Sequence, residues 1–126
     1  MKAINALIVD DSSVMRKIVE RSLRQAGVEL ATVFEAGNGL EALESLRQNA
    51  VNLIVSDINM PTMDGLEFVR QMKTLQLGGG VPVVMITTEG SESNVVEAIS
   101  HGARAYIRKP FTTDQVRERI MPLLEN

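Results

Sequence analysis

The sequence ALIVDDSSVMRKIV, residues 6–19, joins a run of four apolar residues to two adjacent acids and then to a segment with helical spacing. A short apolar run bounded by polar residues is typical of a strand that is buried on both faces, and the acids or the serines that follow are suited to begin a helix. Charged side chains are costly to bury unless they are paired or bind a metal. This stretch therefore predicts a strand, a helix and a polar site between them.

The same unit recurs along the chain. Helical spacing of apolar residues follows each apolar run, and glycines close the first and fourth of these helices. In the first helix Val14, Ile18, Ser22 and Ala26 share one face, and in the last, at 112–124, Pro122 is expected to kink or end the helix. We expect strands at residues 4–9, 30–35, 52–56, 82–87 and 105–108.

Five strands that alternate with five helices predict an α/β fold, in which a parallel sheet is covered on both faces. No GxGxxG follows the first strand, which disfavours the dinucleotide-binding version of this doubly wound class and leaves the flavodoxin-like (βα)5 order 2-1-3-4-5. In this order the first and third strands are neighbours, so we expect Asp10 and Asp11 to lie beside Asp57. Thr87 and Lys109 then approach from the ends of the fourth and fifth strands.

Composition narrows the class of protein. A length of 126 residues fits a single domain, residues 1–126, and the absence of cysteine favours the cytoplasm. No apolar run could cross a bilayer and no signal peptide is recognisable, so we expect a soluble protein with no membrane association. A net charge of −3 with mixed signs, and only three Phe and one Tyr as aromatic residues, give no reason to expect nucleic acid binding.

Four segments together carry a resemblance that spans the chain. VDDSSVMRKIV, SDINMPTMDGLEF, ITTEG and IRKPF resemble the receiver domain of two-component response regulators. Asn59, two residues after Asp57, and Glu89, two residues after Thr87, resemble in particular the single-domain chemotaxis regulators of this family, which have no output domain. The strand order 2-1-3-4-5 is also a property of that family, so the resemblance implies it as well.

The resemblance implies that Asp57 accepts a phosphoryl group from a phosphohistidine of a sensor histidine kinase, which gives an acyl phosphate. It also implies an Mg²⁺ site in which Asp11 and Asp57 bind through carboxylate oxygens. Asn59 would contribute its backbone carbonyl, and Asp10 would act mainly through a bound water. Such a donor set suits Mg²⁺, which takes about six oxygen ligands and keeps several waters.

Lys109 and Thr87 would stabilise the phosphoryl oxygens in the transition state. Thr87 and Tyr106 resemble the switch pair of the family, through which phosphorylation would reshape the face made by the fourth helix, the fifth strand and the fifth helix. The implied partner of that face is a flagellar motor switch component, and a phosphatase is a further possible partner. Other residues of that face would be Arg108, Thr112 and Arg119.

The lifetime of the phosphoryl group would be tuned by Asn59, Thr88 and Glu89. Many receivers place a small residue after the switch threonine, whereas Thr88 is β-branched and larger. We predict that the wild type loses its phosphoryl group more slowly than Thr88→Ala, and equal or slower loss from the variant would contradict this.

Other interpretations remain open. Asp10 and Asp11 could serve only as helix caps, Lys109 could be a solvated charge, and Tyr106 could fill the core. A phosphorelay intermediary would also match the motifs. An aspartate-nucleophile phosphohydrolase would carry a second acid where Asn59 stands, together with a cap domain. We therefore expect no turnover enzyme for external substrates, but a protein that promotes its own phosphorylation and dephosphorylation.

Overall fold

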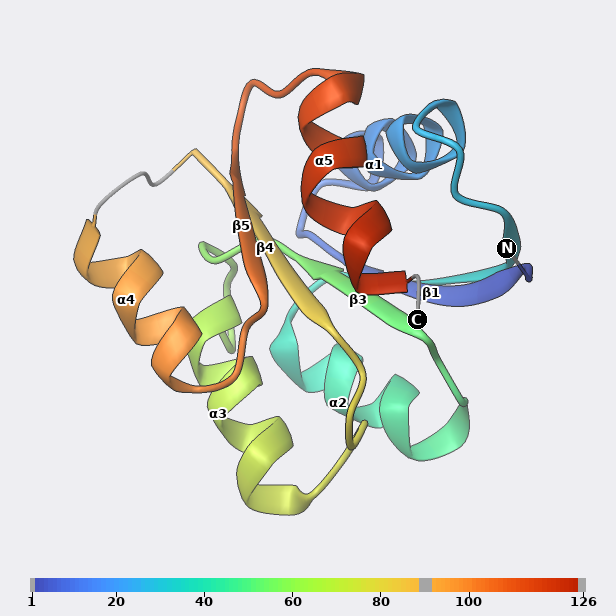
Figure 1. Ribbon diagram of the computed structural model, residues 1–126. Helices are drawn as coiled ribbons and strands as arrows, with labels where there is room; N and C mark the ends of the chain where they lie inside the picture. Colours follow the sequence, from blue (N-terminus) through green and yellow to red (C-terminus); the bar gives the residue numbers. More distant parts are fainter. Residues whose placement is uncertain (1, 89–91, 125–126) are drawn as a thin grey trace.

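Strands and helices alternate along the chain, as the sequence predicts (Figure 1). The computed structural model describes residues 2–88 and 92–124. The strands are β1 (Ile4–Val9), β2 (Leu30–Ala36), β3 (Leu53–Ser56), β4 (Val83–Thr87) and β5 (Ala105–Arg108). The helices are α1 (Ser13–Gln25), α2 (Gly39–Gln48), α3 (Gly65–Leu75), α4 (Glu92–Ser100) and α5 (Thr113–Leu124).

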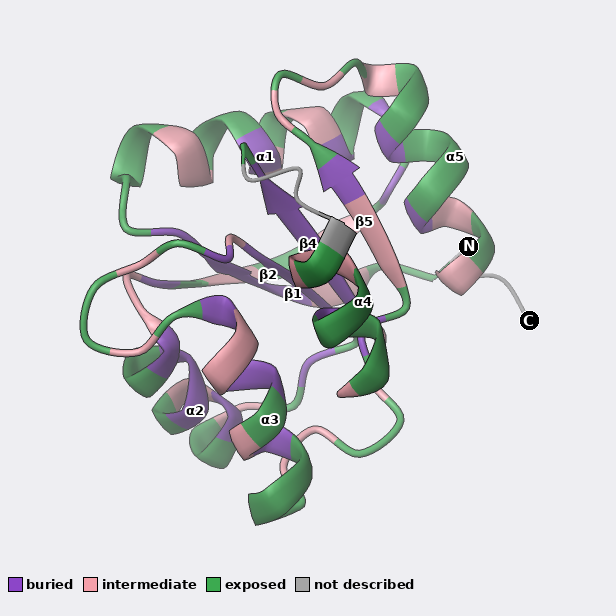
Figure 2. Ribbon diagram, turned by 90° about the vertical axis from the view of Figure 1, so that its left-hand side faces the viewer, coloured by how far each residue is buried: buried purple, intermediate pink, exposed green. Residues whose placement is uncertain are grey.

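All strand pairs are parallel and the order is β2-β1-β3-β4-β5, which confirms the flavodoxin-like prediction. Helices α1 and α5 cover one face of the sheet, and α2, α3 and α4 cover the other (Figure 1). Buried residues are concentrated on the strands between these two layers of helices (Figure 2). Because both faces are covered, the central strands are continuous apolar runs rather than alternating ones.

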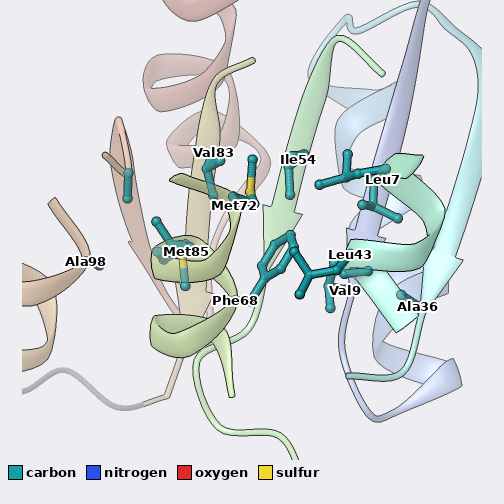
Figure 3. Packing of buried hydrophobic residues seen from close by; sticks show 14 of the residues in the cluster. Leu7, Val9, Ala36, Leu43, Ile54, Phe68, Met72, Val83, Met85 and Ala98 are labelled. Atoms are coloured by element: carbon teal, nitrogen blue, oxygen red, sulfur yellow. The ribbon is translucent and has the colours of Figure 1, made fainter. Parts of the chain in front are cut away.

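Successive strand residues therefore belong to two different cores. Ile54 packs in the cluster under α2, α3 and α4, whereas Val55 packs in the cluster under α1 and α5. Phe68 is fully buried in the first cluster, which also contains Leu43 and Met85 (Figure 3). Burying a side chain of this size stabilises the fold by roughly 1.5–3 kcal/mol.

The predicted shared face of the first helix is not the face that packs on the sheet. Val14 and Ile18 are 69% and 43% exposed, whereas Val19 and Leu23 are buried. Both stripes offer two large apolar side chains one turn apart, so helical spacing alone does not decide between them. The turn at Ser12, where the helix begins, sets which stripe faces the sheet.

The last helix does not end at Pro122, one of the two outcomes expected there. Pro122 lies inside α5, which continues to Leu124. Leu123 and Leu124 pack against the α1–α5 core, and this contact offsets the hydrogen bond that a proline cannot donate. No helix in the described ranges is long and apolar enough to span a membrane.

Candidate functional site

The ends of β1 and β3 bring three acids together at the carboxyl edge of the sheet. Val9 lies opposite Ser56 in the parallel pairing, and the Asp57 amide donates a hydrogen bond to the Val9 carbonyl at 2.8 Å. Asp10, Asp11 and Asp57 each offer a carboxylate oxygen that lies within 4.8 Å of the other two. Asp57 is more than forty residues from Asp10 and Asp11 in sequence, yet the three acids form a cluster that could hold a metal ion.

Lys109 reaches the same cluster from the end of β5. Its amide donates a hydrogen bond to the Thr87 carbonyl at 2.9 Å, which continues the parallel pairing of β4 and β5 by one residue. Its Nζ lies 2.9 Å from Asp10 Oδ2 and 3.5 Å from Asp57 Oδ2. Only 11% of the Lys109 side chain is exposed, so this ammonium is a paired, largely buried charge rather than a solvated one.

A tight turn between β1 and α1 fixes the first acid. Asp10 Oδ1 accepts a hydrogen bond from the Ser12 amide at 2.9 Å, and Ser12 Oγ accepts one from the Met15 amide at 3.1 Å. Ser12 is therefore the N-cap of α1, and Asp10 holds the turn that precedes it. Asp11 is exposed at the tip of this turn. The helix does not need either acid as its cap.

Arg16 supports this turn from α1, and sequence reasoning did not identify it. Its guanidinium donates to the backbone carbonyl of Asp10 at 2.6 Å and to Glu35 at 2.9 Å. Lys17 pairs with the other Glu35 oxygen at 3.0 Å, and these two hydrogen bonds lower the pKa of Glu35. The residue lies within the quoted motif, but its spacing alone does not distinguish it from a surface arginine.

The loop after β3 holds Asp57 through its neighbours. The Ile58 amide donates to Asp57 Oδ1 at 2.7 Å, and the Gly65 amide donates to the Ile58 carbonyl at 2.7 Å. A Cβ at position 65 would lie 2.1 Å from the Asp57 carbonyl oxygen, so only glycine allows this approach. Gly65 lies within the motif SDINMPTMDGLEF, but the motif alone does not indicate this role.

The electrostatics of Asp57 favour a cation nearby. Burial is the largest influence and raises the pKa of Asp57, and the nearby Asp10 carboxylate adds to the rise. The Lys109 ammonium, the Ile58 amide and a hydrogen bond from the Thr87 hydroxyl oppose it. A divalent cation would stabilise the ionised form further, and an all-oxygen donor set of this kind suits Mg²⁺.

The four residues predicted for the partner-binding face lie on β5, on α5 or in the loop between them. Tyr106 lies opposite Met85, and its buried hydroxyl has no hydrogen-bond partner within the described part of the chain. Tyr106, Arg108 and Arg119 line one pocket of about 250 Å³. Thr112 forms a capping box with Gln115 at the start of α5, with hydrogen bonds of 2.9 and 3.1 Å.

Of the three residues predicted to tune the lifetime of the phosphoryl group, the structure describes two. Asn59 is exposed in the loop after β3, two residues beyond Asp57. Thr88 is exposed directly after the fully buried Thr87. Glu89 lies outside the described residues.

The sequence is similar to that of known receiver proteins over nearly its full length. The model of the response regulator receiver domain family matches residues 6–121. Chemotaxis protein CheY1 of Helicobacter pylori is 40% identical over 119 residues, which cover 94% of each chain. The CheY homolog of Campylobacter jejuni is 39% identical over 119 residues, or 94% of this chain and 90% of the homolog.

Solved structures give the same result. Chemotaxis protein CheY4 of Vibrio cholerae has a TM-score of 0.84 at 33% identity and covers 98% of this chain and 100% of its own. A CheY-like receiver domain from Methanospirillum hungatei has a TM-score of 0.83 at 30% identity, with 98% and 94% covered. These similarities extend over nearly the full length of the chain.

Proposed function

Because this chain belongs to the response regulator receiver family as a CheY-like receiver domain, we propose that it is a phosphorylation-switched signalling protein whose phosphoacceptor is Asp57. Receiver domains of this kind are signalling proteins rather than classical enzymes. The phosphoryl donor is a sensor histidine kinase. The observation that carries the proposal is the largely buried Asp57 carboxylate, which lies within reach of two other acids and of the Lys109 ammonium.

The transfer uses one oxygen of Asp57 as the nucleophile. The Ile58 amide already binds Oδ1, and Oδ2 faces Lys109. Oδ2 forms the new bond to phosphorus while the bond from phosphorus to the histidine nitrogen breaks, and the electron pair of that bond stays on the imidazole. Lys109 then lies beside the incoming phosphoryl oxygens, whose negative charge it stabilises.

Asp10, Asp11 and Asp57, with the backbone carbonyl of Asn59, would hold Mg²⁺. Bound Mg²⁺ would neutralise charge on the phosphoryl oxygens during transfer. Both Asp10 oxygens already have partners, Ser12 and Lys109, so Asp10 is less available for direct ligation than the exposed Asp11. This supports the expectation that Asp10 acts through a water.

The signal passes from the site through Thr87 and Tyr106. Thr87 is buried at the end of β4, and Tyr106 is half-buried on the neighbouring β5. Burial of the Tyr106 hydroxyl is unfavourable in its present position, because no partner in the described part of the chain replaces its hydrogen bonds to water. Movement of Thr87 toward a phosphoryl group lets the Tyr106 ring change position and alters the face that carries Arg108 and Arg119. Thr87 and Tyr106 then form a two-state element, and phosphorylation shifts the equilibrium between its two conformations.

Chemotaxis is the pathway that the relatives favour, since the Helicobacter pylori and Campylobacter jejuni proteins are chemotaxis proteins. The downstream partner would then be a flagellar motor switch component, and a phosphatase would end the signal in the cytoplasm. The phosphorelay alternative predicts instead that the phosphoryl group moves on to another histidine.

Intact mass measurement tests the proposal. Wild type incubated with acetyl phosphate and Mg²⁺ is expected to gain one phosphoryl group, while Asp57→Asn and wild type in EDTA are not. An adduct of equal yield on Asp57→Asn would contradict the assignment. Beryllofluoride, a stable mimic of the phosphoryl group, serves where hydrolysis is too fast for an adduct to accumulate.

A further inference from the structure

A second pocket lies at the opposite edge of the sheet from the acids. It has a volume of about 440 Å³ and is formed by the end of α3, the loop at 76–81, the start of β4 and the end of α4. Helices α3 and α4 lie side by side on the same face of the sheet (Figure 1). Because the acids follow the carboxyl ends of the strands, this pocket does not belong to the site described above.

The floor of this pocket is apolar. Val69, Met72 and Val83 are buried side chains that line it, and Leu77 lies half-buried beside them. Ile99 forms a wall and is 53% exposed, an unfavourable state for an aliphatic side chain that a ligand would relieve. The volume falls within the range of about 300–1,000 Å³ that is typical of small-molecule sites.

Among the residues that line the pocket, Lys73 carries the positive charge, His101 can donate a hydrogen bond from its ring, and none is acidic. Some carbonyls at the two helix ends, which would repel an anion, accept backbone hydrogen bonds that partly offset this repulsion: the Leu77 amide donates to the Met72 carbonyl at 2.9 Å and the Ala103 amide donates to the Ala98 carbonyl at 3.0 Å. The bound species should therefore combine an apolar body with negative charge.

One acid, Glu67 on α3, lies near the pocket and interacts electrostatically with His101. It accepts hydrogen bonds from Arg70 and from Gln71, and the Arg70 guanidinium offsets part of its negative charge. Lys73 forms no ion pair within the described part of the chain and is exposed at the rim, where it can meet a ligand.

We propose that this pocket binds a small amphipathic carboxylate, with its apolar body on Val69, Met72 and Val83 and its carboxylate between Lys73 and His101. The proposal does not depend on phosphorylation of Asp57, because the two sites lie at opposite edges of the sheet. It gives the chain a ligand site in addition to its phosphoacceptor.

Methyl and amide NMR titrations with two matched probes test this proposal. 4-Phenylbutyrate and the uncharged 4-phenylbutan-1-ol differ in the charged group alone. We expect saturable shifts centred on the methyl groups of Met72, Val83 and Ile99, with the carboxylate bound about fivefold more tightly, as a partly exposed ion pair allows. Ile99→Gln should weaken binding of both probes.

Charge variants complete the test. The double variant Lys73→Gln/His101→Gln should lose the preference for the carboxylate, whereas Arg47→Gln, an exposed charge on α2 outside the pocket, should keep it. Amide spectra establish that each variant is folded, and Lys73→Gln alone should show a partial loss. Asp57→Asn should bind the carboxylate as the wild type does, even if the chain is never phosphorylated.

Three results would overturn the proposal. Shifts that do not saturate, or that centre on another surface, would exclude this pocket as the site. Equal affinity for the alcohol would exclude the carboxylate assignment. A preference that survives in the double variant would show that Lys73 and His101 do not recognise the charge.

Discussion

Lys109 Nζ lies 2.9 Å from Asp10 Oδ2, closer than its 3.5 Å distance to the Oδ2 of the proposed phosphoacceptor, Asp57. The lysine therefore holds the two acidic strand ends together in the unphosphorylated chain. A phosphoryl group on Asp57 would present this ammonium with phosphoryl oxygens in place of the free Asp57 carboxylate. The ion pair with Asp10 is thus a structural contact, and under the proposed function it is also the position from which Lys109 would reach the phosphoryl oxygens.

Lys109→Met should destabilise the fold by about 3 kcal/mol at pH 7, because it leaves buried carboxylates without their cation. Urea unfolding in Mg²⁺-free buffer measures this loss, which should shrink at low pH as the acids become protonated. Lys2→Met, an exposed lysine, is the control. A loss below about 1 kcal/mol at pH 7 would mean that the ion pairs are not needed for stability.

Asp57→Asn should stabilise the fold at pH 7 by an amount on the order of 1 kcal/mol. The pKa of Asp57 is raised by burial, so the folded state binds the proton more tightly than the unfolded state. The contribution of Asp57 to wild-type stability therefore falls as the pH rises from the ordinary value of 3.8 through the folded-state pKa, and the amide variant escapes this loss.

Unfolding of both proteins from pH 3 to pH 8, in EDTA, measures the difference. The two stabilities should converge at the acidic end, where Asp57 is protonated in both states. A difference that does not depend on pH, or one that grows toward low pH, would contradict the proposed environment of Asp57.

Arg16→Gln should weaken Mg²⁺ binding by about tenfold, the lower end of the effect typical of groups that orient metal ligands. Arg16 binds the Asp10 carbonyl as well as Glu35, whereas Lys17 binds Glu35 without an Asp10 contact. Lys17→Gln is therefore a matched control, which removes a Glu35 contact and a longer ion pair with Glu20 but no contact with Asp10. Calorimetric titration with Mg²⁺ should separate the two variants, and equal affinities would refute a role for Arg16 in positioning Asp10.

Gly65→Ala should cost about 3 kcal/mol or more, because its Cβ would overlap the Asp57 carbonyl oxygen. Gly79→Ala is the matched control, since its Cβ would have no atom within 4 Å and its φ is not positive. That variant should be neutral, or more stable by up to about 1 kcal/mol. Thermal unfolding of the two variants gives the comparison, and similar losses would contradict the close approach at position 65.

Much of the fold follows from patterns that the sequence displays openly. The central strands are buried on both faces, so their apolar runs are continuous, and the acids stand directly after them. The buried face of α1 was not predicted, because Val14 and Ile18 have the same helical spacing as Val19 and Leu23. Which stripe packs depends on how the turn at Ser12 orients the helix, and that is a tertiary property.

The composition of the site was predictable, but its internal contacts were not. Residues at strand ends must share an edge once the strand order is known, which places the three acids and Lys109 together. That Lys109 lies nearer to Asp10, and that Arg16 and Gly65 support the acids, depends on side-chain directions and backbone approach. The pocket at the other edge depends likewise on how the loop at 76–81 packs between two helices.

Under the proposed function, Asp57 carries the phosphoryl group as an acyl phosphate. Borohydride reduction converts an aspartyl phosphate to homoserine, so the most direct measurement is peptide mass spectrometry after phosphorylation with Mg²⁺ and reduction with borohydride. Homoserine at position 57, and at no other aspartate, is the predicted result. Homoserine at Asp10 or Asp11, or its absence from a protein whose intact mass shows the phosphoryl adduct, would contradict it.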